Sequence, residues 1–217
     1  MLVNEIFKSI EGEGVRAGYP TIFIRLFGCN LRCSYCDTRY SCSGTEYTEK
    51  SAEEIVEHCK RWYPNIKRVT LTGGEPLIHR DIRLLIYDLI SNGYQVNIET
   101  NGSIDIEPFV RFDNVIITMD WKSPSSGMNE LMCKPNLSLL RPQDVLKFVV
   151  GSTTDLFEMS AIIVENQIEA QKFVSPVFNK IRPVNIAQFI LARPELYDCR
   201  LQVQLHKIVW EPTMRGV

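Results

Sequence analysis

The stretch that decides the fold is GCNLRCSYCDT, residues 28–38, which follows an apolar run rich in β-branched residues at Thr21–Phe27. The run is typical of a buried strand. In the loop after it, Cys29, Cys33 and Cys36 have the spacing C-x3-C-x2-C. Three thiolates in one short loop can ligate three irons of a [4Fe–4S] cluster. The fourth iron then has no protein ligand and is open to a chelating small molecule.

A structural zinc ion is the alternative occupant of these cysteines. Zinc in a structural site needs a fourth ligand to complete its tetrahedron. Cys42 lies close enough in the sequence to be that ligand, and His58 and Cys59 are weaker candidates. Most of the cysteines outside residues 28–38 are expected to be small apolar residues. The spacing by itself leaves both a cluster and zinc open.

The composition is that of a globular protein without a bulk charge. The 217 residues suffice for one large domain or two small ones, 45% of them are hydrophobic, and the net charge is −2. This charge offers no bulk attraction to nucleic acid or to an anionic membrane. No apolar run is long enough for a transmembrane helix, and the N-terminus does not resemble a signal peptide. We therefore expect a cytoplasmic protein whose cysteines form no disulfide framework.

Strand-like apolar runs alternate with segments of helical period. This alternation predicts an α/β fold, a parallel sheet covered by helices. A complete eight-unit barrel needs about 250 residues. We therefore expect a partial (β/α)6-type TIM-like barrel that is open on one side and forms a single domain over residues 1–217. The alternative is a doubly wound sheet. The expected strands are Thr21–Phe27, Ile66–Leu71, Tyr94–Ile98, Val115–Met119, Val145–Val150, Gln171–Val174 and Leu201–Leu205. The expected helices are Ser51–Trp62, with a capping box of Ser51 and Glu54, Asp81–Ser91, Thr154–Val164 and Val184–Leu191.

Polar residues and glycines follow these strands, and in a barrel they would meet on the face that carries the chemistry. The most unusual of these segments is Thr72-Gly73-Gly74-Glu75-Pro76. It is either a simple turn or a place where two glycines expose backbone groups to a ligand without side-chain hindrance. The corresponding segments after later strands are Glu99-Thr100-Asn101-Gly102, Asp120-Trp121-Lys122, Gly151-Ser152 and Ser175-Pro176.

Taken together, the cysteine spacing, the aromatic Tyr35 before the last cysteine and the Gly73-Gly74-Glu75 run resemble the radical S-adenosylmethionine (SAM) enzymes. The resemblance implies a [4Fe–4S] cluster on the three cysteines, whose open iron chelates SAM and whose reduced form cleaves it to a 5′-deoxyadenosyl radical. No side chain is then expected to be catalytic, because the protein positions the cofactor and excludes side reactions. The residues that the resemblance places near SAM are Gly74, Glu99, Thr100, Asn101, Asp120, Trp121, Lys122, Ser175, Pro176, Val177 and Phe178.

The opening EIFKSIEGEG, residues 5–14, narrows the resemblance to the 7-carboxy-7-deazaguanine synthase family, and the similarity continues to about Lys207. It implies a carbon–nitrogen lyase that converts 6-carboxy-5,6,7,8-tetrahydropterin to 7-carboxy-7-deazaguanine and releases ammonia. This step belongs to the biosynthesis of queuosine and other 7-deazapurines, and SAM is regenerated in it. The same resemblance implies a Mg²⁺ ion on Thr38. The residues that it places against the pterin are Ile10, Glu11, Gly12, Arg25 and Thr72.

Among the implied pterin contacts, Glu11 departs from the family pattern and Arg25 has two possible roles. Glu11 stands where the family has Gln, and a carboxylate only accepts hydrogen bonds whereas an amide also donates them. Arg25 either offers a planar fork to the substrate carboxylate or forms a structural ion pair with a nearby Glu. The resemblance further implies a homodimer and a flavodoxin- or ferredoxin-type reductant. No role follows for the tail after Lys207.

Two competing functions share some of these features. A radical SAM activating enzyme that installs a glycyl radical on a partner protein has the same cysteine spacing, but it does not account for residues 5–14 or for Arg25. A non-enzymatic zinc module or iron–sulfur electron carrier accounts for the cysteines alone. The three-ligand model predicts that Cys42→Ala leaves the cluster content unchanged.

Overall fold

One nine-stranded sheet organises the molecule in the computed structural model, which describes residues 1–217. Its strand order is β3-β1-β2-β4-β5-β6-β7-β8-β9. All neighbours from β2 to β9 are parallel, whereas β1 is antiparallel to both β2 and β3. Because β3 and β9 do not pair with each other, the sheet is an open, partial barrel, as the sequence predicted. The strands are β1 (Leu2–Ile10), β2 (Pro20–Leu26), β3 (Thr48–Glu49), β4 (Arg68–Gly73), β5 (Gln95–Thr100), β6 (Val115–Trp121), β7 (Val145–Val150), β8 (Gln171–Pro176) and β9 (Cys199–Leu201).

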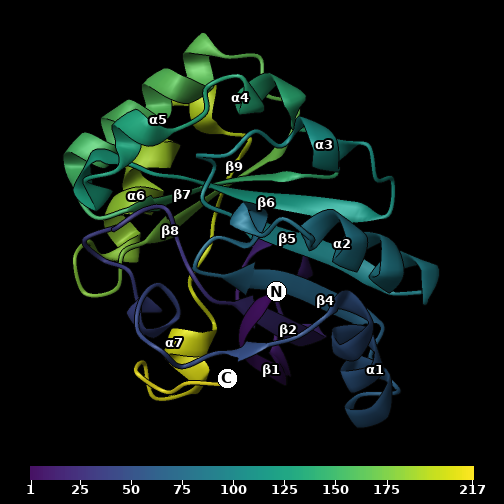
Figure 1. Ribbon diagram of the computed structural model, residues 1–217. Helices are drawn as coiled ribbons and strands as arrows, with labels where there is room; N and C mark the ends of the chain where they lie inside the picture. Colours follow the sequence, from purple (N-terminus) through teal and green to yellow (C-terminus); the bar gives the residue numbers. More distant parts are fainter.

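Helices cover the outside of the sheet, and the C-terminal segment then crosses back to the N-terminal strands (Figure 1). In the figure this segment, coloured yellow, leaves β9 and runs through α7 to the C-terminus near β1. Residues far apart in the sequence therefore meet near the open side of the barrel. The helices are α1 (Ala52–Trp62), α2 (Ile82–Ser91), α3 (Glu107–Val110), α4 (Asn136–Leu139), α5 (Thr153–Glu165), α6 (Pro183–Leu191) and α7 (His206–Val209).

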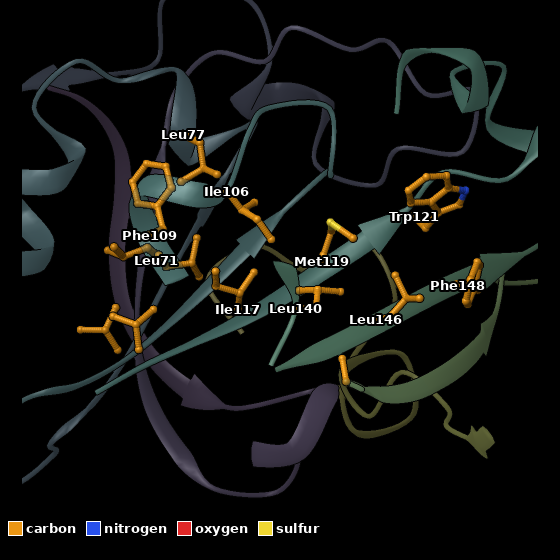
Figure 2. Close-up of a cluster of buried hydrophobic side chains, with 14 of the residues drawn as sticks. Leu71, Leu77, Ile106, Phe109, Ile117, Met119, Trp121, Leu140, Leu146 and Phe148 are labelled. Atoms are coloured by element: carbon orange, nitrogen blue, oxygen red, sulfur yellow. The ribbon is translucent and has the colours of Figure 1, made fainter. Parts of the chain in front are cut away.

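The strands alternate between an apolar face under the helices and a polar face inside the barrel. In β6, Ile117, Met119 and Trp121 belong to the buried apolar cluster, while Thr118 and Asp120 line a cleft on the other face. Figure 2 shows the three apolar side chains pointing into the same layer as those of β4, β7 and the helical connections. Each fully buried aliphatic or aromatic side chain contributes about 1.5–3 kcal/mol, so the apolar layer stabilises the sheet while the polar face remains free to bind a ligand.

The two longest helices, α1 and α5, begin at capping boxes. The predicted capping box of α1 is present, with the Ser51 hydroxyl accepting from the backbone N–H of Glu54 and the Glu54 carboxylate accepting from that of Ser51. Ser152 and Asp155 form a second capping box at the start of α5, which was not predicted. Each box satisfies helix N–H groups that have no partner within the helix.

Three expectations about the strands were wrong or incomplete. Residues 2–10 form β1, although its alternation is weak because only Val3 is buried. The last strand is Cys199–Leu201 rather than Leu201–Leu205, because the Gln202 side chain turns to hydrogen-bond both backbone groups of Gly14. Strands β4, β5, β6 and β8 run two residues further than expected, so several residues lie in strand ends rather than in loops: Thr72, Gly73, Glu99, Thr100, Asp120, Trp121, Ser175 and Pro176.

Candidate active site

A cleft of about 1030 Å³ opens at the carboxyl ends of the strands. Its walls come from the end of β1, the cysteine loop, the polar strand ends and the C-terminal tail. The structure therefore brings together segments that are up to two hundred residues apart in the chain. The expected site residues that line the cleft are Ile10, Glu11, Gly12, Arg25, Cys29, Cys33, Cys36, Thr38, Thr72, Gly74, Glu99, Thr100, Asn101, Asp120, Lys122, Val177 and Phe178.

Three expected SAM contacts do not line this cleft. The Trp121 side chain is 4% exposed and belongs to the apolar cluster under the helices (Figure 2). Ser175 is fully buried, and its hydroxyl donates to Glu13 Oε1 at 2.9 Å. Pro176 lines a smaller neighbouring pocket with Phe178 and Lys180. Only the backbone of these strand-end residues is therefore left to approach a ligand in the cleft.

Backbone and side-chain contacts hold the cysteine loop against two strand ends. The Cys29 thiol accepts from Leu31 N at 3.4 Å and from Asn101 Nδ2 at 3.8 Å. On the other side of the loop, Ser34 N donates to Ser126 O at 3.0 Å. All three thiols are partly exposed to the cleft. The loop is thus fixed at both ends while its sulfur atoms remain accessible.

Cys42 is a fourth thiol close to this loop. Its hydrogen-bonding interaction lowers the pKa of both Cys29 and Cys36 to about 6, and raises the pKa of Cys42 itself far above its ordinary value. Burial raises the pKa of Cys33. Thiolates are the form that binds metal, so these shifts favour the ligating form at Cys29 and Cys36 and disfavour it at Cys42.

The residues present fit an iron–sulfur cluster better than a zinc ion. A tetrahedral zinc site draws its sulfur atoms to about 2.3 Å from one centre, and the structure gathers no three His, Cys, Asp or Glu side chains around a point where one ion could bind. A cubane cluster instead takes its thiolates at separate corners. Cys29, Cys33 and Cys36 are therefore the residues that would hold a [4Fe–4S] cluster.

The two glycines at the end of β4, Gly73 and Gly74, are required by close packing. A Cβ atom on Gly73 would lie 2.1 Å from the Leu26 carbonyl oxygen, and one on Gly74 would lie 2.0 Å from that of Gly28 and 2.9 Å from Cys29 Cβ. The same contact carries the hydrogen bonds from Gly74 N to Leu26 O and from Glu75 N to Gly28 O, at 3.0 and 2.8 Å. The glycines thus press the end of β4 against the loop that carries the first cysteine.

Glu75 ties this turn to the next strand end. Its carboxylate accepts from Leu77 N, from the Thr100 hydroxyl and from Asn101 N, at 3.1, 2.9 and 2.6 Å. Burial raises the pKa of Glu75 to about 7, although these hydrogen bonds oppose the shift. Since Asn101 also donates to Cys29, Glu75 positions a residue that contacts the cysteine loop.

Arg25 forms the structural ion pair that the sequence left open. Its Nε lies 2.7 Å from Glu5 Oε1, which also accepts from the Tyr40 hydroxyl at 2.9 Å. The two terminal nitrogens of the guanidinium make no hydrogen bond within the chain, and the side chain lines the cleft. The ion pair therefore orients the guanidinium and leaves its outer edge available.

The C-terminal tail closes one wall of the cleft, a feature that the sequence did not reveal. Lys207 Nζ lies 2.9 Å from Asp37 Oδ2 and donates to Pro212 O at 3.1 Å. Although burial opposes the shift, His206 and Lys207 hold the pKa of Asp37 well below its usual range. The Arg215 guanidinium lies 3.9 Å from the centre of the Tyr40 ring. These contacts fasten residues 206–217 to the loop that contains Cys36 and Thr38.

Thr38 lies beside the last cysteine. Its hydroxyl is 3.8 Å from Cys36 Sγ, and its carbonyl oxygen accepts from the Ser41 hydroxyl and from the Cys42 thiol, at 2.8 and 3.6 Å. The hydroxyl thus lies at the cleft wall, with the Cys36 thiol as its hydrogen-bond partner.

Two buried ion pairs line the floor of the cleft. Lys147 Nζ lies 3.2 Å from Glu13 Oε2, and Lys122 Nζ lies 2.8 Å from Asp120 Oδ2. Burial disfavours both charges of the first pair, yet the partner keeps the pKa of Glu13 low and that of Lys147 high. Sequence reasoning missed Lys147, although a lysine inside the apolar strand VLKFVV is itself a signal, because a buried charge requires a partner.

Comparison with known proteins assigns this arrangement. Residues 23–162 match the model of the Radical SAM superfamily, and the chain belongs to that superfamily. It therefore carries a [4Fe–4S] cluster and uses SAM. Within the superfamily it belongs to the 7-carboxy-7-deazaguanine synthases. It is 42% identical to the synthase of Clostridium acetobutylicum, over 99% of this chain and 98% of that protein, and 41% identical to that of Methanospirillum hungatei, over 98% and 86%.

Solved structures confirm the fold. The crystal structure of QueE from Escherichia coli superposes with a TM-score of 0.77 at 24% identity, covering 94% of this chain and 93% of that one. SuiB from Streptococcus suis, bound to its precursor peptide, superposes with a TM-score of 0.60 over 83% of this chain and 47% of that one. In addition, no helix of the chain is both long and apolar enough to span a membrane.

Proposed function

We propose that this chain converts 6-carboxy-5,6,7,8-tetrahydropterin to 7-carboxy-7-deazaguanine with release of ammonia, in 7-deazapurine biosynthesis. The observation that carries the proposal is the full-length similarity to synthases of that name, 42% identity over 98% of one of them. The cleft supports the proposal, because the cysteine loop (residues 28–38), the Gly73-Gly74 turn and the polar strand ends all line it. A glycyl-radical activating enzyme would not need the polar wall that Glu11 and Gly12 form after the end of β1.

The cluster and SAM, when bound, would supply radical chemistry, the capacity to abstract a hydrogen atom from an unactivated carbon of the substrate. The chain's own part is to hold SAM and substrate in a fixed relation and to keep water away from the reacting carbon. The SAM-binding residues would be those nearest the cysteine loop: Gly74, Glu99, Asp120, Lys122, Val177 and Phe178, with backbone contacts from Trp121, Ser175 and Pro176.

Arg25 would bind the substrate carboxylate. Its guanidinium is held by Glu5 through Nε, and its free outer edge matches the two oxygens of a carboxylate. Ile10, Gly12 and Thr72 would contact the pterin ring from the adjoining wall. The ion pair and the substrate contact are therefore compatible, since they use different edges of one guanidinium.

Mg²⁺ would bind between Thr38 and the substrate. A single hydroxyl is a weak ligand for a hard cation, so most of the coordination would come from substrate oxygens and water. The site would exist in full only when the pterin is bound. We also propose a flavodoxin- or ferredoxin-type reductant and a homodimer, on the similarity to the family.

An anaerobic turnover assay tests the function. The reconstituted chain is incubated with SAM, dithionite, Mg²⁺ and 6-carboxy-5,6,7,8-tetrahydropterin, and the products are measured by mass spectrometry. The expected result is 7-carboxy-7-deazaguanine, with less product without Mg²⁺. Arg25→Gln should raise KM far more than Lys60→Gln, whose ion pair with Glu57 is exposed. Unchanged pterin beside cleaved SAM would overturn the proposal.

A further inference from the structure

Glu11 is a buried carboxyl group in the cleft that forms no ion pair. It is 1% exposed, lines the cleft, and has one side-chain hydrogen bond, a 2.6 Å contact between Oε2 and the Thr70 hydroxyl. Glu13, two residues further along, pairs with Lys147 and accepts from Ser175 and Gln204. Of these two neighbouring carboxyl groups, Glu13 thus has a cationic partner and Glu11 has none. Such a difference in environment allows one acid to be ionised while the other stays protonated.

Each cation near Glu11 is committed to another partner. Arg16 donates to the backbone carbonyls of Val69 and Gln95, at 3.4 and 2.9 Å. Lys147 lies 3.2 Å from Glu13. The remaining charged neighbour is Glu99 on β5, which is also an acid and lines the same cleft. A charge on Glu11 would therefore be buried, without a direct counter-ion and next to another carboxylate.

On the basis of the proposed function, we propose that Glu11 is a neutral carboxyl group when the enzyme is active, and that it positions the pterin by donating its O–H proton to the ring edge while its other oxygen accepts. A neutral carboxyl group offers one donor and one acceptor. The lactam edge of a pterin, an N–H beside a C=O, offers the complementary pair. An ionised Glu11 would instead repel the ring carbonyl and add to the negative charge that faces an anionic substrate.

The balance of forces at Glu11 agrees with this geometry. Burial is the largest effect and raises the pKa of Glu11 to about 7, with a further contribution from the charge of Glu99. The Thr70 hydrogen bond, Arg16 and Lys147 oppose the shift without cancelling it. Above that pH the group ionises, so pterin binding should weaken as the solution becomes more alkaline.

Infrared difference spectra give a test that needs no turnover. The spectrum of the wild-type chain minus that of Glu11→Gln, recorded at about pH 6, should show the C=O band of a protonated carboxyl group, and the band should be lost at about pH 9. Glu57→Gln, an exposed control on α1, should show no such band. A carboxylate band at Glu11 across this range would overturn the inference.

Binding of 6-carboxypterin to the reconstituted, SAM-loaded holoenzyme gives the second readout. The wild-type affinity should fall about tenfold per pH unit above the pKa of Glu11, whereas Glu11→Gln, which keeps a donor and an acceptor, should bind with an affinity within about threefold of wild type at neutral pH and lack the alkaline decline. Glu11→Ala should bind weakly at every pH. Parallel pH profiles for wild type and Glu11→Gln would contradict the donor role of Glu11, even if the wild type forms product. A wild type that forms no product would instead contradict the proposed function. The infrared result would then decide the protonation state of Glu11.

Discussion

Replacing Lys147 by Met tests the buried ion pair on the cleft floor. The side chains of Lys147 and Glu13 are only 6% and 9% exposed, and their charged atoms lie 3.2 Å apart. Removing one partner of such a pair leaves a buried charge without compensation, which costs about 3–5 kcal/mol. For a chain of this size each kcal/mol lowers Tm by about 2–4 °C, so the expected fall is roughly 6–20 °C.

The pH dependence gives the sign of this effect. Folding lowers the pKa of Glu13 and raises that of Lys147. The pair therefore stabilises the fold fully between the ordinary carboxyl pKa and the ordinary lysine pKa. This contribution is lost as pH falls through the lowered Glu13 pKa or rises through the raised Lys147 pKa. Without the lysine, the buried Glu13 carboxylate becomes neutral only when it binds a proton. The destabilisation of Lys147→Met should therefore be largest near neutral pH and shrink toward about pH 5.

The assay is thermal and urea unfolding of the metal-free chain, followed by circular dichroism, for each single variant and for the double variant Glu13→Gln/Lys147→Met. The double variant should recover at least half of the loss, because neither charge then remains buried. Lys60→Met is the matched control: its exposed ion pair with Glu57 should change stability by less than about 0.5 kcal/mol. A Lys147→Met loss as small as the control, or single losses that simply add, would refute the reasoning.

Three further substitutions have expected outcomes. Cys42→Ala should leave iron and sulfide content per chain unchanged, because the three-ligand model assigns no cluster iron to Cys42, and loss of iron would contradict that model. Gly74→Ala should lower iron content after reconstitution, since its Cβ would lie 2.0 Å from the Gly28 carbonyl oxygen; full occupancy would show that the loop can move without cost. Ser152→Ala should lower the free energy of unfolding by about 1 kcal/mol in urea titrations, through loss of the capping box with Asp155; an unchanged midpoint would exclude that contribution.

The parallel part of the fold could be predicted because its signals are local. Apolar runs and capping residues such as Ser51 and Glu54 lie next to the structure that they specify. Strand β1 gave little signal, because only Val3 is buried and its pairing depends on β2, which is itself folded against β4. Strand ends were placed two residues short because Thr72 and Asp120 are polar, yet in a barrel the inner face tolerates polar residues right to the end of the strand.

The sequence predicted most of the residues that line the cleft, but not the partners that hold them. The cysteine spacing and the glycine turn identify one end of the cleft from the sequence alone. The pairing of Arg25 with Glu5 and that of Lys147 with Glu13 are long-range contacts that no local pattern encodes. The same holds for the tail, whose Arg215 reaches Tyr40 across 175 positions of sequence. The first two contacts depend on how β1 and the segment after it pack against β2 and β7, and the third depends on where the chain returns after β9.

The most direct measurement of the central claim is electron paramagnetic resonance of the anaerobically reconstituted, dithionite-reduced chain, before and after SAM is added. If one iron of the cluster carries no protein ligand, the reduced cluster should give a signal whose shape changes when SAM chelates that iron. A signal that SAM leaves untouched, or a chain that retains only zinc, would contradict the assignment of the cysteine loop and with it the chemistry proposed for the cleft.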